Sequence, residues 1–226
     1  MMRRMSLFPL ISVLAYTTAL ATTGGRDSNV PATRIYTYAT TLLPNVGYTI
    51  RTFGLSTGAD TVLHVQSYPS GLYLAGNDDV SGLDLSSSVY ISSSSSSRQV
   101  WIVVRAYSAG SGGAATLGIK PDGQSESIQA FYFESGYERD LSATGAPYQT
   151  EFMGVEQQGG TPDAVILVTS DDPAHAIAFD DDDGIDTMPW VRLTQANGQV
   201  CTGAFCRVYI GRRTQTTGAP DQITLV

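Results

Sequence analysis

The sequence predicts an all-β protein built from two tandem β-sandwich domains, and three observations lead to this prediction. Short runs of Val, Ile, Thr, Tyr, Phe and Trp alternate with clusters of Gly, Ser, Asn, Asp and Pro at fairly regular intervals. No stretch keeps helical periodicity long enough to predict a helix. The same order of strands and acidic turns also occurs twice along the chain.

Residues 1–21 have the features of a secretory signal peptide. The basic start M-M-R-R-M-S precedes the apolar run L-F-P-L-I-S-V-L-A-Y, which is too short to cross a bilayer, and the small-residue pattern Ala19-Leu20-Ala21 follows. Cleavage there makes Thr22 the first residue of the mature chain. A retained membrane anchor is the alternative, but we expect a secreted protein with no membrane span after cleavage.

The charge balance argues against a nucleic-acid partner. The formal net charge is −8, and removal of the signal peptide with Arg3 and Arg4 makes it more negative. Lys120 is the only lysine of the chain, and no basic patch is present in the sequence. Such a chain repels nucleic acid and anionic lipid.

The first domain is expected at residues 22–120. Its segment V-W-I-V-V is almost continuously apolar, which is typical of a central strand covered on both faces. The serine tract at 86–98 is interpreted as a strand followed by a flexible exposed turn, with O-glycosylation as the alternative. The expected strands include R-I-Y-T-Y-A, D-T-V-L-H-V-Q-S, V-Y-I at 89–91, W-I-V-V-R at 101–105 and A-T-L-G-I at 115–119.

The second domain is expected at 128–226, after a linker at 121–127, and A-F-Y-F-E is interpreted as its first strand. Asp163 lies 103 positions after Asp60, and D-A-V-I-L-V-T-S there matches D-T-V-L-H-V-Q-S. The same offset aligns the two acidic clusters, which pairs Asn77, Asp78 and Asp79 with Asp180, Asp181 and Asp182. Later matches are V-R-L at 191–193, V-Y-I-G-R at 208–212 and Q-I-T-L-V at 222–226. Two copies of one domain explain this agreement.

The succession Y-T-I-R-T-F-G, G-A-D-T-V-L-H-V, L-A-G-N-D-D and V-W-I-V-V-R-A-Y resembles the bacterial pre-peptidase C-terminal (PPC) domain family. The resemblance covers 33–120 well and 128–226 more loosely. It implies two tandem jelly-roll-like β-sandwich domains whose acidic turns hold calcium. Two departures are that D-D-D-D replaces N-D-D-V in the second copy and that no peptidase domain precedes either module. The implied ligands are Asp60, Asn77, Asp78 and Asp79 in the first copy and Asp163, Asp180, Asp181 and Asp182 in the second.

The chemistry of the acidic clusters leads to the same expectation. Calcium takes six to eight oxygen ligands and accepts irregular geometry, so a turn with several carboxylates beside another aspartate supplies much of a coordination shell. Without a cation the adjacent carboxylates would repel one another and raise one another's pKa values. The alternative is a solvated acidic loop without metal.

Two other features bear on stability and catalysis. Cys201 and Cys206 are the only cysteines, and in an exported chain a structural disulfide between them is expected, with a redox-active pair as the alternative. His64 and His175 each align with a leucine of the other copy, so packing explains them better than catalysis. No common nucleophile or metalloprotease motif occurs, so we expect no enzyme activity.

The sequence therefore favours a secreted, calcium-stabilised, non-catalytic structural or adhesive protein. Self-association into an extracellular filament or surface layer is expected, because tandem sandwiches can stack and a strand can pair with an open sheet edge of another copy. A carbohydrate-binding or polymer-binding accessory module for a separate secreted enzyme is the alternative, with an extracellular glycan or protein as partner. A small hydrolase is the third hypothesis.

Overall fold

The computed structural model confirms that the chain folds into all-β sandwich domains. It describes residues 27–31, 34–134, 137–140, 150–157, 164–170, 172–181, 189–194, 207–213 and 222–225. Within these ranges the regular elements are strands, and no helix is long and apolar enough to cross a membrane. The predicted signal peptide at 1–21 and the cysteine pair Cys201 and Cys206 lie outside the described residues.

The first sandwich consists of two four-stranded layers. Its inner layer has the strand order β2 (Arg34–Leu42), β7 (Arg98–Ala106), β4 (Thr61–Ser67) and β5 (Tyr73–Asn77), which is part of a larger sheet. Its outer sheet has the order β6 (Ser88–Ile91), β3 (Tyr48–Phe53), β8 (Gly113–Pro121) and β9 (Ser127–Phe133). All neighbouring strands in these two layers are antiparallel.

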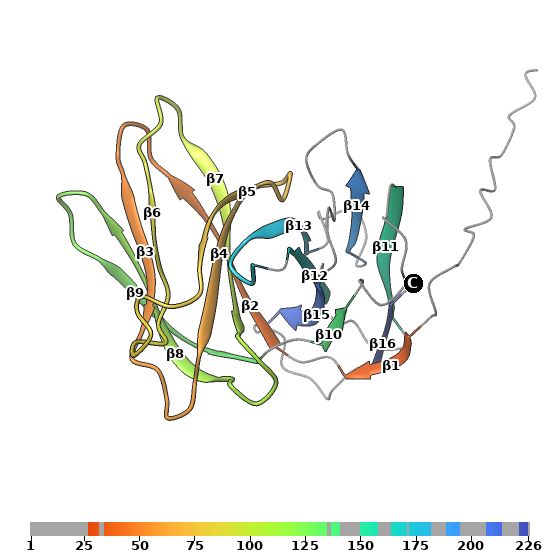
Figure 1. The fold of residues 1–226 in the computed structure, drawn as a ribbon. Coiled ribbons are helices and arrows are strands. Elements are labelled where there is room, and N and C mark those ends of the chain that lie inside the picture. The colour runs from red at the N-terminus through yellow and green to blue at the C-terminus, as the bar shows by residue number, and fades with distance from the viewer. Residues whose placement is uncertain are drawn as a thin grey trace, which may run out of the picture.

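The second sandwich repeats this plan. Its inner layer has the order β13 (Ala176–Asp180), β12 (Ala164–Thr169), β15 (Arg207–Arg213) and β10 (Tyr137–Asp140). A short parallel pairing of β15 with β2 joins the two inner layers into one eight-stranded sheet. Its outer sheet has the order β14 (Trp190–Thr194), β11 (Thr150–Gln157), β16 (Gln222–Leu225) and β1 (Asp27–Pro31). Figure 1 shows the result as four layers of strands side by side, with the two inner layers in the middle.

The structure bears out the spacing of the repeat. The β5 strand covers 73–77 and β13 covers 176–180, so the second begins and ends 103 positions after the first. Each pairs with the strand that precedes it, β4 or β12, and each of those pairs in turn with a long apolar strand, β7 or β15. The acidic turns therefore follow equivalent strands in the two sandwiches.

The expected linker at 121–127 is different in the structure. These residues connect β8 to β9 as the turn of an antiparallel hairpin, in which the Gln124 amide donates to the Pro121 carbonyl. The segment A-F-Y-F-E, expected to open the second domain, thus lies in the first sandwich. Its physical anchor is Phe131, which is buried and stacks on Tyr36 with ring centroids 4.2 Å apart. A Pro-Asp-Gly sequence suits a hairpin turn as well as a linker, so composition alone did not separate the two.

The central strands are apolar on both faces because each inner layer packs against two others. On β4, Leu63 and Val65 belong to the core of the first sandwich. A second apolar cluster lies between the two inner layers and joins Trp101 and Val103 of β7 to Leu167 and Phe179 of the second sandwich. The rings of Trp101 and Phe179 lie 6.0 Å apart between centroids. Burial of this cluster stabilises the contact between the sandwiches through the hydrophobic effect.

Glycines allow the two sandwiches to approach closely at two equivalent places. A Cβ atom on Gly71 would collide with the backbone carbonyl of Phe179, and one on Gly76 would collide with that of Ala174. In the repeat, 71 corresponds to 174 and 76 corresponds to 179. Exchanging the two repeats therefore converts one contact into the other, as in an interface around a local two-fold axis.

Arg105 supplies a polar link across the same interface. Its side chain is fully buried, and its guanidinium lies 3.8 Å from the ring centroid of Tyr209 in the second sandwich. It donates to the carbonyls of Ala106 and Tyr107 in the first sandwich and of Pro173 in the second, over distances of 2.8 Å, 3.3 Å and 3.1 Å. A cation over an aromatic face is favourable, more so when both groups are removed from water.

Candidate functional site: an acidic cluster in the first sandwich

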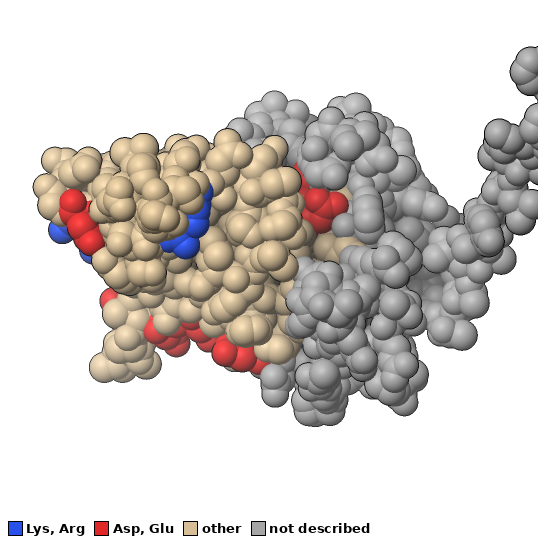
Figure 2. Space-filling model, turned by 90° about the horizontal axis from the view of Figure 1, so that it is seen from above, with Lys and Arg blue, Asp and Glu red and all other residues tan. Residues whose placement is uncertain are grey.

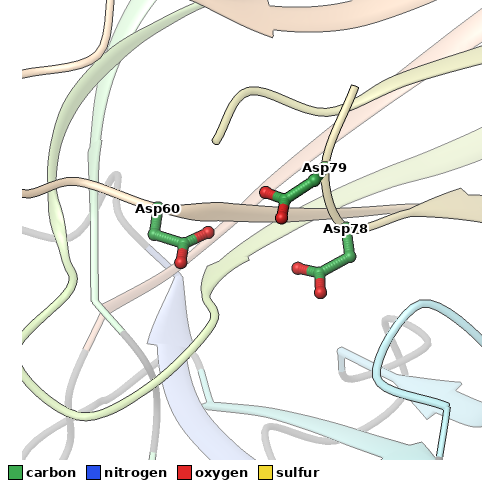
Figure 3. A group of neighbouring side chains, drawn as sticks. All are labelled: Asp60, Asp78 and Asp79. Carbon is green, nitrogen blue, oxygen red and sulfur yellow. The ribbon is translucent and has the colours of Figure 1, made fainter. Parts of the chain in front are cut away.

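Three of the predicted ligands, Asp60, Asp78 and Asp79, come together at one end of the first sandwich. One carboxylate oxygen from each lies within 4.8 Å of the others. Figure 3 shows the three side chains pointing toward one another, with Asp60 just before β4 and the other two just after β5. The sequence separation of these positions is bridged because β4 and β5 are neighbours in the inner sheet.

Backbone hydrogen bonds fix Asp60 at the start of β4. Its amide donates to the Ser111 carbonyl, and its carbonyl accepts from the Tyr107 amide. Asp60 is thereby held beside the loop that follows β7. Asp78 and Asp79 leave β5 directly after Asn77, which pairs with Leu63 of β4.

A buried group of hydroxyls holds the two halves of the cluster together. The Ser87 hydroxyl lies 2.6 Å from the Thr61 carbonyl and 2.7 Å from the Asp78 carbonyl, and it can donate to either. The Thr61 hydroxyl lies 2.7 Å from that of Thr52 and 3.0 Å from that of Ser87. The Ser87 amide also donates to the Thr52 hydroxyl over 2.8 Å. Sequence reasoning missed these residues, because Ser87 stands in a serine tract with nothing to mark it as different from its neighbours.

The carboxylates are held partly away from water. One oxygen each of Asp60, Asp78 and Asp79 is buried and has no hydrogen-bond partner among the residues that the structure describes. Buried polar groups normally have partners, so an unpartnered oxygen on each of three converging carboxylates calls for an explanation. A bound cation supplies one.

The electrostatics of the cluster agree with this geometry. Burial, followed by repulsion from Asp79 and Asp60, raises the pKa of Asp78 to about 6. Burial and then Asp79 also raise the pKa of Asp60, while the positive charge of Arg105 acts in the opposite direction on both groups. Asp172 of the second sandwich adds a smaller repulsion to Asp78. The cluster therefore carries more negative charge than its surroundings neutralise.

The fourth predicted ligand of this copy, Asn77, has a different partner. Its side-chain oxygen accepts a hydrogen bond of 2.9 Å from the Ser88 amide at the start of β6. Asn77 thus links the inner layer to the outer sheet through its side-chain oxygen.

The second predicted cluster is described only in part. Asp180 is the last residue of β13 and is partly buried, and Asp181 after it is 3% exposed. Asp163 and Asp182 lie outside the described residues. Among the residues that the structure does describe, the acidic group near Asp60 is the one whose ligand atoms converge.

The two histidines lie at the interface between the sandwiches. His64 is fully buried, and burial and the nearby Arg105 hold its pKa well below 6.5. The side chain is therefore neutral at physiological pH. The ring of His175 packs on that of Tyr73 with centroids 4.4 Å apart.

The loop after the cluster presents apolar side chains to solvent. Leu83 is fully exposed at its tip, between Val80 and Leu85, which are 53% and 39% exposed. Asp84 shapes this loop by accepting bonds of 3.1 Å and 2.6 Å from the Ser86 amide and hydroxyl. These exposed apolar side chains are available for contact with another surface.

The donor set suits a hard divalent cation. Carboxylate oxygens are the ligands that calcium and magnesium prefer, and calcium tolerates an irregular shell completed by carbonyls and water. Three carboxylates converging from two segments fit the first requirement. A bound ion would also offset the burial and the repulsion that raise the pKa of Asp78.

Comparison with protein-family models and with curated proteins finds no match. Among solved structures, the secreted serine protease VesC from Vibrio cholerae is similar at 11% sequence identity and a TM-score of 0.24. The match covers 89% of this chain and 49% of that one, so this chain spans about half the length of the structure it matches. A likeness this distant carries no argument about fold or function. The resemblance to the PPC family therefore stays a prediction.

Proposed function

We propose that the chain is a secreted, non-catalytic structural or adhesive protein whose first sandwich is stabilised by calcium. The observation that carries this proposal is the convergence of Asp60, Asp78 and Asp79, each with a buried carboxylate oxygen that has no hydrogen-bond partner among the described residues. A cation bound there joins the start of β4 to the segment after β5. Its role is structural, because it locks the end loops of the sandwich.

Three further observations support a role in contact rather than catalysis. His64 is fully buried and neutral, so it is badly placed to exchange protons with a substrate. The loop with Val80, Leu83 and Leu85 offers an apolar contact surface next to the cluster. On the face seen in Figure 2 the described surface is mostly uncharged, and Asp and Glu form small separate groups. Such a surface suits adhesion or assembly with copies of the same chain.

Thermal unfolding with calcium, with magnesium and with EDTA tests the cation. A ligand that binds only the folded state stabilises it by about 2.7 kcal/mol when its concentration is about 100 times the dissociation constant. We expect calcium to raise the melting temperature of the wild type and to have little effect on Asp79→Asn. Asp122→Asn is the matched control, because Asp122 bonds Tyr90 in the outer sheet, away from the cluster. Equal melting curves in calcium and EDTA would contradict the cation site.

Assembly has its own test. The full-length chain, imaged by negative stain and passed through a sizing column over a wide concentration range, is expected to form filaments or sheets as its concentration rises. Monodisperse monomers at every concentration would count against this part of the proposal while leaving the cation site intact.

A carbohydrate-binding or polymer-binding accessory module is the second candidate, and exposed tyrosines favour it. Tyr90 and Tyr132 are 58% and 45% exposed, and the register of the outer sheet places both on its solvent face. Aromatic rings on a flat face can stack against a sugar ring. Glycan-array binding that disappears in Tyr90→Ala and Tyr132→Ala, with unchanged melting, would support this candidate. Absence of any glycan signal would exclude it in favour of assembly.

A further inference from the structure

The outer sheets of the two sandwiches are completed in different ways. In the first, the strand beside β8 is β9, which follows β8 directly through a tight turn. In the second, the equivalent position beside β16 is taken by β1, which precedes the first repeat in the chain. The second sandwich therefore depends on a strand that belongs, by sequence, to the start of the first.

Among the residues that the structure describes, the β1 strand has a partner on one side only. It is an edge strand whose ladder partner is β16, with Val30 opposite Ile223 and Pro31 opposite Gln222. Only residues 32 and 33 separate it from β2, which lies in the inner layer of the first sandwich. Release of β1 breaks this one ladder and leaves the β16 edge open, with unpaired amides and carbonyls ready to accept another strand.

Every copy of the chain carries both parts of this contact. A β1 strand from a second copy presents the same residues to β16 and can adopt the same register. Exchange of an identical element is a route to oligomers that needs no new contact surface. Since the donor and the acceptor are different parts of one chain, the exchange is head-to-tail, which builds an open chain of copies unless it closes into a ring.

We propose that β1 is a donor strand that passes from the β16 edge of its own chain to the β16 edge of another copy. This inference deepens the assembly role given under Proposed function and rests on it. Pairing within one chain has the advantage of high effective concentration, so exchange is expected to grow with protein concentration. The cation cluster takes no part, because it lies in the first sandwich.

Two variants with one added cysteine each test the exchange directly. Val30 and Ile223 are directly opposed across the β1 and β16 ladder, at a separation that suits a disulfide. Full-length Val30→Cys and Ile223→Cys chains are mixed, warmed to release β1, cooled and oxidised, and non-reducing gels reveal covalent dimers. Val30→Cys mixed with Thr224→Cys is the matched control, since Thr224 is one residue out of register with Val30. Wild type gives the background from the native cysteines.

The expected result is a heterodimer band several times stronger for the Ile223→Cys mixture than for the control, rising with protein concentration. Bands of equal strength would overturn the proposal. A Val30→Cys and Ile223→Cys double variant that fails to close its disulfide would also overturn it, because the pairing would then be absent. Filaments that form without this crosslink would support self-assembly but show that β1 is not the donor strand. Monomers throughout would reject both.

Discussion

At the scale of single residues, the acidic cluster makes stability depend on pH. Burial raises the pKa of Asp78 from 3.8 to about 6, so the folded state holds this proton more tightly than the unfolded chain does. The resulting stabilisation is full below about pH 4 and is lost as pH rises through about 6. The pKa of Asp60 shifts in the same direction. In the absence of a cation, the folded state is thus weakened at neutral pH.

Asp78→Asn tests this conclusion. The amide cannot ionise, so the variant in EDTA is expected to unfold at higher denaturant than the wild type at pH 7, by about 1 kcal/mol after solvent screening. Its stability should also change less between pH 4 and pH 6. Urea unfolding across this pH range is the measurement. A variant as pH-dependent as the wild type would show that the carboxylates do not interact as described.

Ser87→Ala tests the hydroxyls that hold the cluster. The substitution removes a buried hydroxyl that donates to the carbonyls of Thr61 and Asp78. We expect the free energy of unfolding to fall by about 1 to 3 kcal/mol. Calcium affinity, measured by titration calorimetry, should fall as well because Asp60 and Asp78 are no longer held in place. Ser96→Ala in the exposed part of the same serine tract is the control. Equal losses from the two substitutions would argue against a special role for Ser87.

Residue types and spacing were enough to predict part of the site. Asp60, Asp78 and Asp79 were found because carboxylates recur at matched positions after matched strands. Asn77 was assigned with them because it is adjacent in the sequence, which does not reveal the hydrogen bond that its side-chain oxygen accepts from the Ser88 amide. Ser87 and Thr52 were missed, since a hydroxyl becomes a structural element only when the fold brings a partner to it.

At the scale of elements, the contact between β5 and β13 depends on glycine. Gly76→Ala is expected to destabilise the chain by about 1 to 3 kcal/mol, because the added methyl group collides with the Ala174 carbonyl and the sandwiches must separate slightly. Gly82→Ala is the matched control, as a methyl group there would meet no other atom within 4 Å. Chemical denaturation compares the two. A midpoint for Gly76→Ala equal to that of the control would mean that the two sandwiches do not pack closely there.

Strand positions were easier to predict than strand partners. The runs at β4 and β12 are short, apolar and bounded by turn residues, so local pattern identifies them. The partner of β9 is set by the burial of Phe131 and Phe133 in the first sandwich, which local pattern does not reveal. Local pattern also does not reveal the partner of β1, because β16 lies far away in the sequence.

At the scale of the whole molecule, the two sandwiches are expected to unfold together. They share an apolar cluster, the Arg105 link and a parallel pairing of β15 with β2, so loss of one exposes the inner face of the other. The chain has two tryptophans, Trp101 in the first sandwich and Trp190 in the second. Fluorescence of Trp101→Phe and Trp190→Phe chains in urea should therefore give the same midpoint. Separate midpoints would show two independent domains.

The reciprocal glycine contacts also bear on how a single copy of the repeat could associate. Gly71 lies against Phe179 as Gly76 lies against Ala174, and the repeat makes each pair the counterpart of the other. One patch used twice is how two identical molecules associate in a symmetric homodimer. We infer that a chain with a single copy of this unit could bury the same patch by pairing with a second copy of itself around a two-fold axis.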